Sequence, residues 1–299
     1  MKGRFAPSPT GRMHMGNIYS ALLAWLSARK QGGGFVLRIE DIDRQRSKAE
    51  YAALIADDLK WLGLDWDEQY TQSERFSIYE KELEKLNNQG LTYPCYCTRA
   101  DIMATQAPHE SDGRVVYKGT CRPGNLQKNS VEGRKGATRL MVPDRDITFC
   151  DGLYGKQTVN LARQCGDFIL QRADKAWAYQ LAVVADDALM GITEVVRGRD
   201  LLLSVPQQIY LYELLGYTAP AFTHIPLLCN EAGQRLSKRD QSLDMQHLRE
   251  LYSPEEIIGR LACHAGIIDR PEPAKASDLV PLFSWKNVPT DDIVIKKAE

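Results

Sequence analysis

The 299-residue sequence lacks several features that would assign it at once to a familiar class. It contains no run of 18 uninterrupted apolar residues, and its first residues, Met1-Lys2-Gly3-Arg4, do not begin an apolar leader. We therefore expect no membrane association, no secretion signal and a cytoplasmic location. The net charge is only −1, so any contact with nucleic acid must come from local basic patches. The two common nucleotide-binding loops, G-x-x-x-x-G-K and G-x-G-x-x-G, are also missing.

The seven cysteines do not suggest a disulfide framework, because their number is odd and no secretion signal precedes them. Reduced thiols or metal ligands are the expected roles. The remaining composition is that of an ordinary globular protein, with 43% hydrophobic and 26% charged residues.

The first 40 residues predict a β-α-β unit. A short strand at 3–5 leads into a loop with two prolines and two glycines, and apolar residues then recur at helical spacing over 18–31. Three glycines end that helix, and 35–39 reads as a strand. Such a unit implies a parallel sheet with a right-handed crossover, and hence an α/β fold.

Further patterns predict helices at 48–62, 75–88 and 205–215, the last with Ser204 as N-cap, and strands at 194–196 and 224–228. The cysteine- and turn-rich stretch 93–165 reads as an insertion. The last 60 residues are expected to be helical at first and to end in a polar tail.

Two loops carry candidate chemistry. In the first, "RFAPSPTGRMHMGN" (4–17), Gly11 and Gly16 allow a phosphate to approach the backbone at a helix N-terminus, and His14 can donate to it. In the second, "GQRLSKRD" (233–240), three cations surround a serine and can close over a triphosphate. Taken alone, the first is more often a plain surface loop and the second a solvated charge run.

Together the two loops resemble the HIGH and KMSKS signatures of class I aminoacyl-tRNA synthetases, in the form found in the glutamate-specific enzymes. The stretches "RIEDIDRQR" (38–46), "YQLAVVADDALMGITEVVRGRDLL" (179–202) and "HIPLLCNEAGQRLSKR" (224–239) extend the resemblance over nearly the whole chain. One departure is Asn17, which occupies the fourth HIGH position where a second histidine is usual; its amide can still donate a hydrogen bond.

The resemblance implies a Rossmann-like class I catalytic fold divided into four parts. These are a first half (1–93), an inserted zinc-bearing domain (94–177), a second half (178–234), and the lysine loop with a small helical stem-contact-like region (235–299).

The resemblance also implies that the glutamate α-carboxylate attacks the α-phosphate of ATP, with Mg²⁺ accompanying ATP although no dedicated carboxylate cage is evident. His14 and Lys238 are then the residues that stabilise the phosphates. Glu40 would receive the α-ammonium group, and Arg4 would pair with a carboxylate. The implied glutamate contacts are Arg4, Phe5, Ala6, Pro7, Ser8, Glu40, Tyr179 and Arg197; the implied ATP contacts are His14, Gly16, Asn17, Arg235, Leu236, Ser237, Lys238 and Arg239. Without the resemblance, Arg4 and Arg38 could equally be salt-bridge partners and Tyr179 a core residue.

The triplet Cys95, Cys97 and Cys121 has the spacing of a structural zinc site that needs a fourth ligand. His109 is the natural candidate from its chemistry, whereas the family pattern C-x-C…Y-x-x-x-C makes Tyr117 the ligand. The other four cysteines, Cys150, Cys165, Cys229 and Cys263, are expected to be ordinary buried thiols.

Only 60 residues follow Arg239, too few for a large anticodon-binding region. A catalytic half of this size resembles the glutamyl-queuosine tRNA(Asp) synthetases, which implies transfer of glutamate to queuosine in the anticodon loop of tRNA(Asp) by a monomer. Two alternatives remain: a truncated or minimal glutamyl-tRNA synthetase, and a non-catalytic paralogue that binds tRNA or amino acid.

Overall fold

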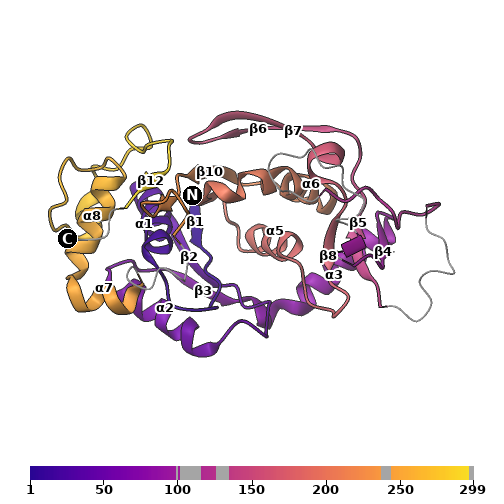
Figure 1. Cartoon of the computed structure of the whole chain (residues 1–299), viewed down its shortest axis with the longest axis horizontal. Helices are drawn as coiled ribbons and strands as arrows, with labels where there is room; N and C mark the ends of the chain where they lie inside the picture. The colour runs from indigo at the N-terminus through magenta and orange to yellow at the C-terminus, as the bar shows by residue number, and fades with distance from the viewer. Residues whose placement is uncertain (99, 102–115, 126–134, 237–243, 296–299) are drawn as a thin grey trace.

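The computed structural model describes residues 1–98, 100–101, 116–125, 135–236 and 244–295. The molecule is elongated (Figure 1), with the parallel strands near its centre, an antiparallel sheet at one end and the C-terminal helices at the other. Within these ranges, no helix is both long enough and apolar enough to cross a lipid bilayer.

The central strands have the order of a Rossmann fold. Strands β1 (Lys2–Phe5), β2 (Gly34–Ile39) and β3 (Glu68–Thr71) pair in parallel, as do β9 (Glu194–Gly198) and β10 (Ala221–Ile225). The two groups meet where β1 runs beside β9, since the Thr193 N–H donates to the Lys2 carbonyl at 2.9 Å. The chain order therefore reverses between β1 and β9, which in open α/β sheets is where ligands bind. In spatial order these strands are β3, β2, β1, β9 and β10.

The core helix α1 (Met15–Lys30) is buried on nearly all sides, from Ile18 to Ala28, and lies against β1 and β9. Its largely apolar sequence accounts for this, because a helix that is apolar all round must be covered all round. The other connecting helices are amphipathic or packed between elements: α2 (Ala49–Trp61), η1 (Gln72–Arg75), α3 (Phe76–Asn88), α5 (Tyr179–Leu189), η4 (Arg199–Ser204) and α6 (Val205–Leu215).

Most predicted bounds differ from the observed ones by one or two residues, and three details differ for a physical reason. Helix α1 begins at Met15 instead of residue 18, because His14 and Asn17 form a capping box. The predicted strand 224–228 is interrupted at Pro226, which has no N–H for a ladder. Ser204 does stand at the N-cap of α6, but its side chain makes no capping hydrogen bond. The reason is that η4 runs directly into α6, so the backbone of Ser204 is itself helical.

The predicted insertion contains two different structures. Strands β4 (Thr92–Cys95), β5 (Ala137–Leu140) and β8 (Phe168–Gln171) form a separate antiparallel sheet. The hairpin of β6 (Asp146–Asp151) and β7 (Gly155–Asn160), which is followed by η3 (Leu161–Cys165), instead joins the edge of the main sheet through β6 and β10. Figure 1 shows this hairpin along the top of the molecule.

The C-terminal region packs on the first half of the fold. Helices α7 (Met245–Leu251), α8 (Pro254–His264) and α9 (Ala276–Leu279) share a hydrophobic core with α1 and α2. The expectation of a polar tail is wrong for residues 293–294, because β12 (Ile293–Val294) pairs with β11 (Leu228–Cys229). The chain thus returns to the residues that precede the lysine loop.

Candidate active site

A pocket of about 400 Å³ opens at the carboxyl ends of β1 and β9, where the strand order reverses. Residues from the opening loop, the start of α1, the position after β2, α5, β9 and the hairpin before the lysine loop converge on it. Ser237, Lys238 and Arg239 lie outside the described residues. Every other residue that the sequence analysis assigned to glutamate or ATP lines the pocket: Arg4, Phe5, Ala6, Pro7, Ser8, His14, Gly16, Asn17, Glu40, Tyr179, Arg197, Arg235 and Leu236.

His14 is held by the helix that it caps. Its Nδ1 accepts the Gly16 N–H at 3.1 Å, and the Asn17 Oδ1 accepts the His14 N–H at 3.0 Å. Because Nδ1 is an acceptor, a neutral His14 carries its proton on Nε2 and can donate from there. A β-carbon on Gly16 would lie 3.0 Å from the imidazole, which explains glycine at that position. Asn17, the departure from the HIGH pattern, is therefore part of the helix cap.

The described residues on both sides of the lysine loop are anchored beside His14. On one side, the Leu236 N–H donates to the Leu228 carbonyl at 2.9 Å, and Arg235 pairs with Asp200. On the other, the Met245 N–H donates to the Met13 carbonyl at 2.9 Å. The described residues that flank the lysine loop, more than 200 residues from the opening loop in sequence, are thus neighbours of that loop in space.

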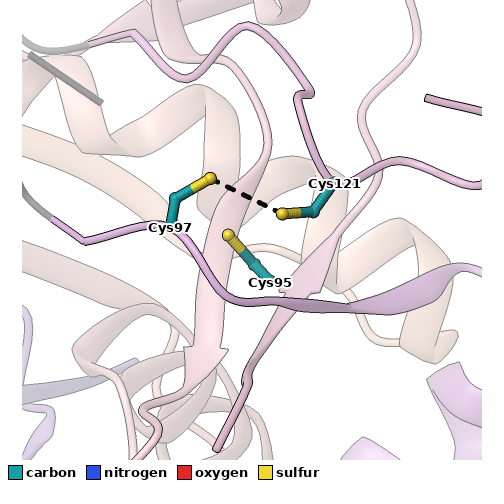
Figure 2. Close-up of side chains that lie close together, drawn as sticks. All are labelled: Cys95, Cys97 and Cys121. Carbon is teal, nitrogen blue, oxygen red and sulfur yellow. Dashed lines mark hydrogen bonds between the residues drawn. The ribbon is translucent and has the colours of Figure 1, made fainter. Parts of the chain in front are cut away.

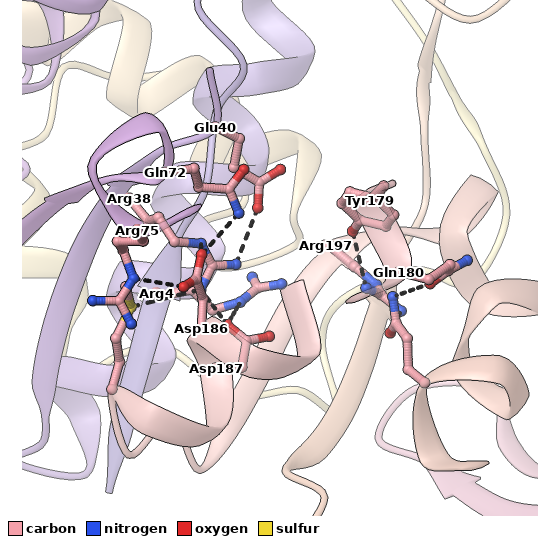
Figure 3. Close-up of polar contacts among 12 residues, drawn as sticks. Arg4, Arg38, Glu40, Gln72, Arg75, Tyr179, Gln180, Asp186, Asp187 and Arg197 are labelled. Atoms are coloured by element: carbon pink, nitrogen blue, oxygen red, sulfur yellow. Dashed lines mark hydrogen bonds and ion pairs between the residues drawn. The ribbon is translucent and has the colours of Figure 1, made fainter. Parts of the chain in front are cut away.

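Buried arginines and carboxylates form a charge cluster below the pocket (Figure 3). Arg38, fully buried on β2, donates to Asp187 at 2.5 Å and to Glu40 at 3.0 Å. Arg4 lies 3.6 Å from Asp187 and donates to the Val196 carbonyl at 3.0 Å. Arg38 is thus a salt-bridge partner, whereas Arg4 is both an ion-pair partner and a pocket residue.

The cluster is completed by Asp186, which accepts hydrogen bonds from Arg75 at 2.6 Å, Tyr79 at 2.8 Å and Gln72 at 2.9 Å. Three arginines therefore face three carboxylates, and the formal charges cancel. Burial raises the pKa of Glu40 even though Arg38 lies beside it, and burial lowers the pKa of Arg4.

Arg197, at the end of β9, has a different environment. Its Nη1 lies 3.3 Å from the Tyr179 hydroxyl (Figure 3), and its Nη2 donates to Gln208 at 2.8 Å. No carboxylate lies within 4 Å of its guanidinium among the residues that the structure describes. Arg197 therefore offers the pocket a positive charge without a counter-ion, which suits an anionic ligand.

Several residues around the site escaped sequence analysis. Asp200 and Leu201 line the pocket, and His224 and Asp151 lie behind Arg197. A usable signal was present for His224, because it is the only ionisable residue in the predicted strand 224–228, whose other residues are apolar or proline. The structure shows that its side chain is fully buried. Asp151 offered no comparable signal, since it ends a strand with alternating polar residues.

The three cysteines predicted to bind metal come together in the antiparallel domain (Figure 2). Their sulfur atoms lie within 4.8 Å of one another, and the Cys97 and Cys121 sulfurs are 3.5 Å apart. The Tyr117 hydroxyl oxygen is 3.5 Å from the Cys95 sulfur and 3.6 Å from that of Cys97. Ligand bonds of about 2.0–2.3 Å in a tetrahedral zinc site give ligand–ligand edges of roughly 3.5–3.8 Å, so this donor set fits a metal.

His109, the alternative fourth ligand, lies outside the described residues. The remaining cysteines are not all buried as expected: Cys229 is buried, but Cys165 and Cys263 are half-buried and Cys150 is exposed. Cys150 lies on the hairpin strand β6, where every second side chain (Asp146, Thr148 and Cys150) faces solvent.

Comparison with known proteins agrees with this geometry. The family model described as "tRNA synthetases class I (E and Q), catalytic domain" matches residues 1–274. The glutamyl-Q tRNA(Asp) synthetase of Symbiobacterium thermophilum is 46% identical, over 98% of this chain and 95% of its own. The glutamyl-Q tRNA(Asp) synthetase of Deinococcus radiodurans is 45% identical, over 94% of this chain and 95% of its own length.

Two glutamate enzymes are also similar. The glutamate–tRNA ligase of Aquifex aeolicus is 41% identical over the whole chain, which spans 65% of that protein. The crystal structure of glutamate–tRNA synthetase from Elizabethkingia anophelis superimposes with a TM-score of 0.84 and 30% identity, over 99% of this chain and 68% of that one. The chain therefore belongs to the class I tRNA synthetases for glutamate and glutamine and, among them, to the family of the glutamyl-Q tRNA(Asp) synthetases.

Proposed function

We propose that the protein activates L-glutamate with ATP and transfers the glutamyl group to the queuosine base at the wobble position of tRNA(Asp). The observation that carries the proposal is the pocket at the switch point. It combines an uncompensated guanidinium, Arg197, with a buried carboxylate, Glu40, and a helix N-terminus capped by His14. A dicarboxylic amino acid and a nucleoside triphosphate together require these three kinds of group.

In the first step, an oxygen of the glutamate α-carboxylate attacks the α-phosphorus of ATP, and pyrophosphate leaves. Arg197, with Tyr179 beside it, holds one carboxylate of glutamate, and Glu40 accepts from its α-ammonium group. Arg4, Phe5, Ala6, Pro7 and Ser8 complete this subsite.

His14 donates from Nε2 to a phosphate oxygen that gains negative charge, and the N-terminus of α1 stabilises the same charge. Lys238, with Arg235 and Arg239, neutralises the triphosphate from the lysine loop. Among the described residues, Glu40 and Asp200 are the only carboxylates that line the pocket, and each is paired with an arginine. Neither is therefore free to hold Mg²⁺ before ATP binds, so the ion enters with ATP.

In the second step, a hydroxyl of the acceptor attacks the activated carbonyl carbon, AMP leaves, and the hydroxyl proton is released. The cyclopentene-diol of queuosine supplies such a hydroxyl, as a ribose does. Two lines of comparison support the queuosine acceptor. The relatives named glutamyl-Q tRNA(Asp) synthetases match this chain over 95% of their own length, whereas the chain spans only 65% of the Aquifex glutamate–tRNA ligase.

For the cysteine cluster we propose one structural Zn²⁺, held by Cys95, Cys97, Cys121 and Tyr117. The Arg139 guanidinium lies 3.9 Å from the centre of the Tyr117 ring. Burial raises the pKa of the Tyr117 phenol, so the bound metal would have to displace its proton before the phenolate oxygen could serve as a ligand. The metal would tie together a domain whose own buried cluster consists of little more than these ligands and Tyr93.

The acceptor is tested with isolated anticodon stem-loops. We expect a stem-loop of tRNA(Asp) with queuosine to receive labelled glutamate, and the same stem-loop with guanosine at that position to remain unlabelled. Labelling at the 3′ end of tRNA(Glu) would instead identify a glutamyl-tRNA synthetase. Absence of glutamate-dependent ATP–pyrophosphate exchange would identify a non-catalytic binding protein.

A further inference from the structure

The side chain of Arg197 is linked by hydrogen bonds, through His224, to the buried carboxylate of Asp151 two strands away in the same sheet. The Nε of Arg197 lies 3.0 Å from Nε2 of His224, and Nδ1 of His224 lies 2.6 Å from Oδ2 of Asp151. The three residues come from β9, β10 and β6, and His224 and Asp151 are at most 2% exposed. His224 is outside the pocket lining, so it acts only through another residue.

These distances define the tautomer of His224. The Nε of an arginine always carries a hydrogen, so Nε2 of His224 must accept it and cannot be protonated. The ring proton is therefore on Nδ1, from which it donates to Asp151. Asp151 is fixed as the charged acceptor, because its Oδ1 also receives the Leu153 N–H at 3.1 Å and the Tyr154 N–H at 3.0 Å.

We propose that Asp151 and His224 are positioning residues that hold the Arg197 guanidinium in place for the carboxylate of the substrate. The proposal rests on the proposed function, which assigns glutamate to Arg197. A neutral imidazole between the two charges has a specific advantage: it orients the guanidinium without cancelling its charge. Arg38, which contacts two carboxylates directly, shows the alternative arrangement.

The arrangement requires His224 to stay neutral. Three charged groups face it: Asp151 on β6, Arg197 on β9 and Arg4 on β1. Burial lowers the pKa of His224, and the two arginines lower it further, while Asp151 opposes them. A proton added to Nε2 in acid would point at the Arg197 N–H and repel it. Because the pKa of His224 is lowered, glutamate affinity should fall only below the pH range in which an ordinary imidazole titrates.

The primary test is Asp151→Asn, with glutamate binding to the full chain measured by calorimetry. The backbone donors hold the amide oxygen at the Oδ1 position, so the amide NH₂ faces Nδ1 of His224 and moves the ring proton to Nε2. Because a hydrogen bond from a charged group is then lost, we expect glutamate to bind about tenfold more weakly, with ATP affinity unchanged. A loss of less than about threefold would overturn the proposal.

The pH profile gives a second readout that a purely structural role would not move. His224→Gln keeps an acceptor for Arg197 but cannot titrate, so the weaker binding in acid should disappear while affinity at pH 8 is retained. An unchanged acid limb would refute the mechanism. His264→Phe, at a half-buried histidine on α8, is the matched control and should behave as wild type.

Arg197→Lys separates this proposal from the proposed function. If that variant binds glutamate as wild type does, the assignment of Arg197 to the substrate is wrong. If it loses affinity while Asp151→Asn does not, the assignment stands and the positioning role fails.

Discussion

Asp187→Asn tests whether the buried charge cluster is as closely balanced as its geometry indicates. Asp187 lies on α5, only 2% exposed, and its Oδ1 is 2.5 Å from Nη1 of Arg38 and 3.6 Å from Nε of Arg4. Asparagine has nearly the same shape and can keep one hydrogen bond. The substitution therefore removes a charge and leaves the packing intact.

The magnitude follows from the charge count. Three arginines and three carboxylates sum to zero, so the variant carries one net positive charge around Arg38 and position 187, which are at most 2% exposed. Removing one partner of a buried ion pair costs about 3–5 kcal/mol. We expect the lower end, about 3 kcal/mol, because Glu40 and Asp186 still face Arg38.

Urea unfolding followed by tryptophan fluorescence measures this cost, and thermal unfolding should show a decrease in Tm of about 6–12 °C. Asp144→Asn, at an exposed aspartate whose arginine partner is also exposed, is the control and should unfold as wild type. Coincident unfolding curves for Asp187→Asn and wild type would show that the cluster tolerates an uncompensated charge, and the reasoning would be wrong.

Three further predictions concern the lysine loop, the metal and the packing of α8. Lys238→Ala should slow ATP–pyrophosphate exchange about a hundredfold while calorimetry shows unchanged glutamate affinity, and an unaltered exchange rate would remove the loop from the mechanism. Metal analysis of the wild-type protein should find one zinc per chain, and Cys121→Ser should lose the zinc with little effect on ATP binding. If wild-type protein purified without chelator contains no zinc, the proposed zinc site is wrong. Gly259→Ala should lower the free energy of unfolding by about 1–3 kcal/mol, measured by urea unfolding, because the added β-carbon would lie 1.8 Å from the Glu272 carbonyl oxygen. Gly34→Ala is the control: its β-carbon would have 3.7 Å of clearance, so we expect wild-type stability.

The sequence by itself determined those features of the structure that depend on residues close together along the chain. Helix α6 (Val205–Leu215) has the predicted bounds, because its apolar spacing, its first-turn proline and the left-handed Gly216 that ends it are all local signals. The opening β-α-β unit was also predicted from local patterns, and the spacing of Cys95, Cys97 and Cys121 was sufficient to predict that these three residues cluster. The start of α1 was missed, because histidine is not a usual capping residue.

Only the tertiary structure decided which arginines are free to bind a ligand. Arg38 and Arg197 are both buried near the ends of strands, but Arg38 is paired with Glu40 on its own strand end and with Asp187 on α5, 149 residues away, whereas Arg197 has no carboxylate beside it among the described residues. The imidazole that orients Arg197 is brought beside it by the pairing of β9 and β10, and its carboxylate partner comes from a hairpin inside the predicted insertion. Sequence spacing carries no information about such pairs, because strand order and crossover direction, and not distance along the chain, decide which side chains meet.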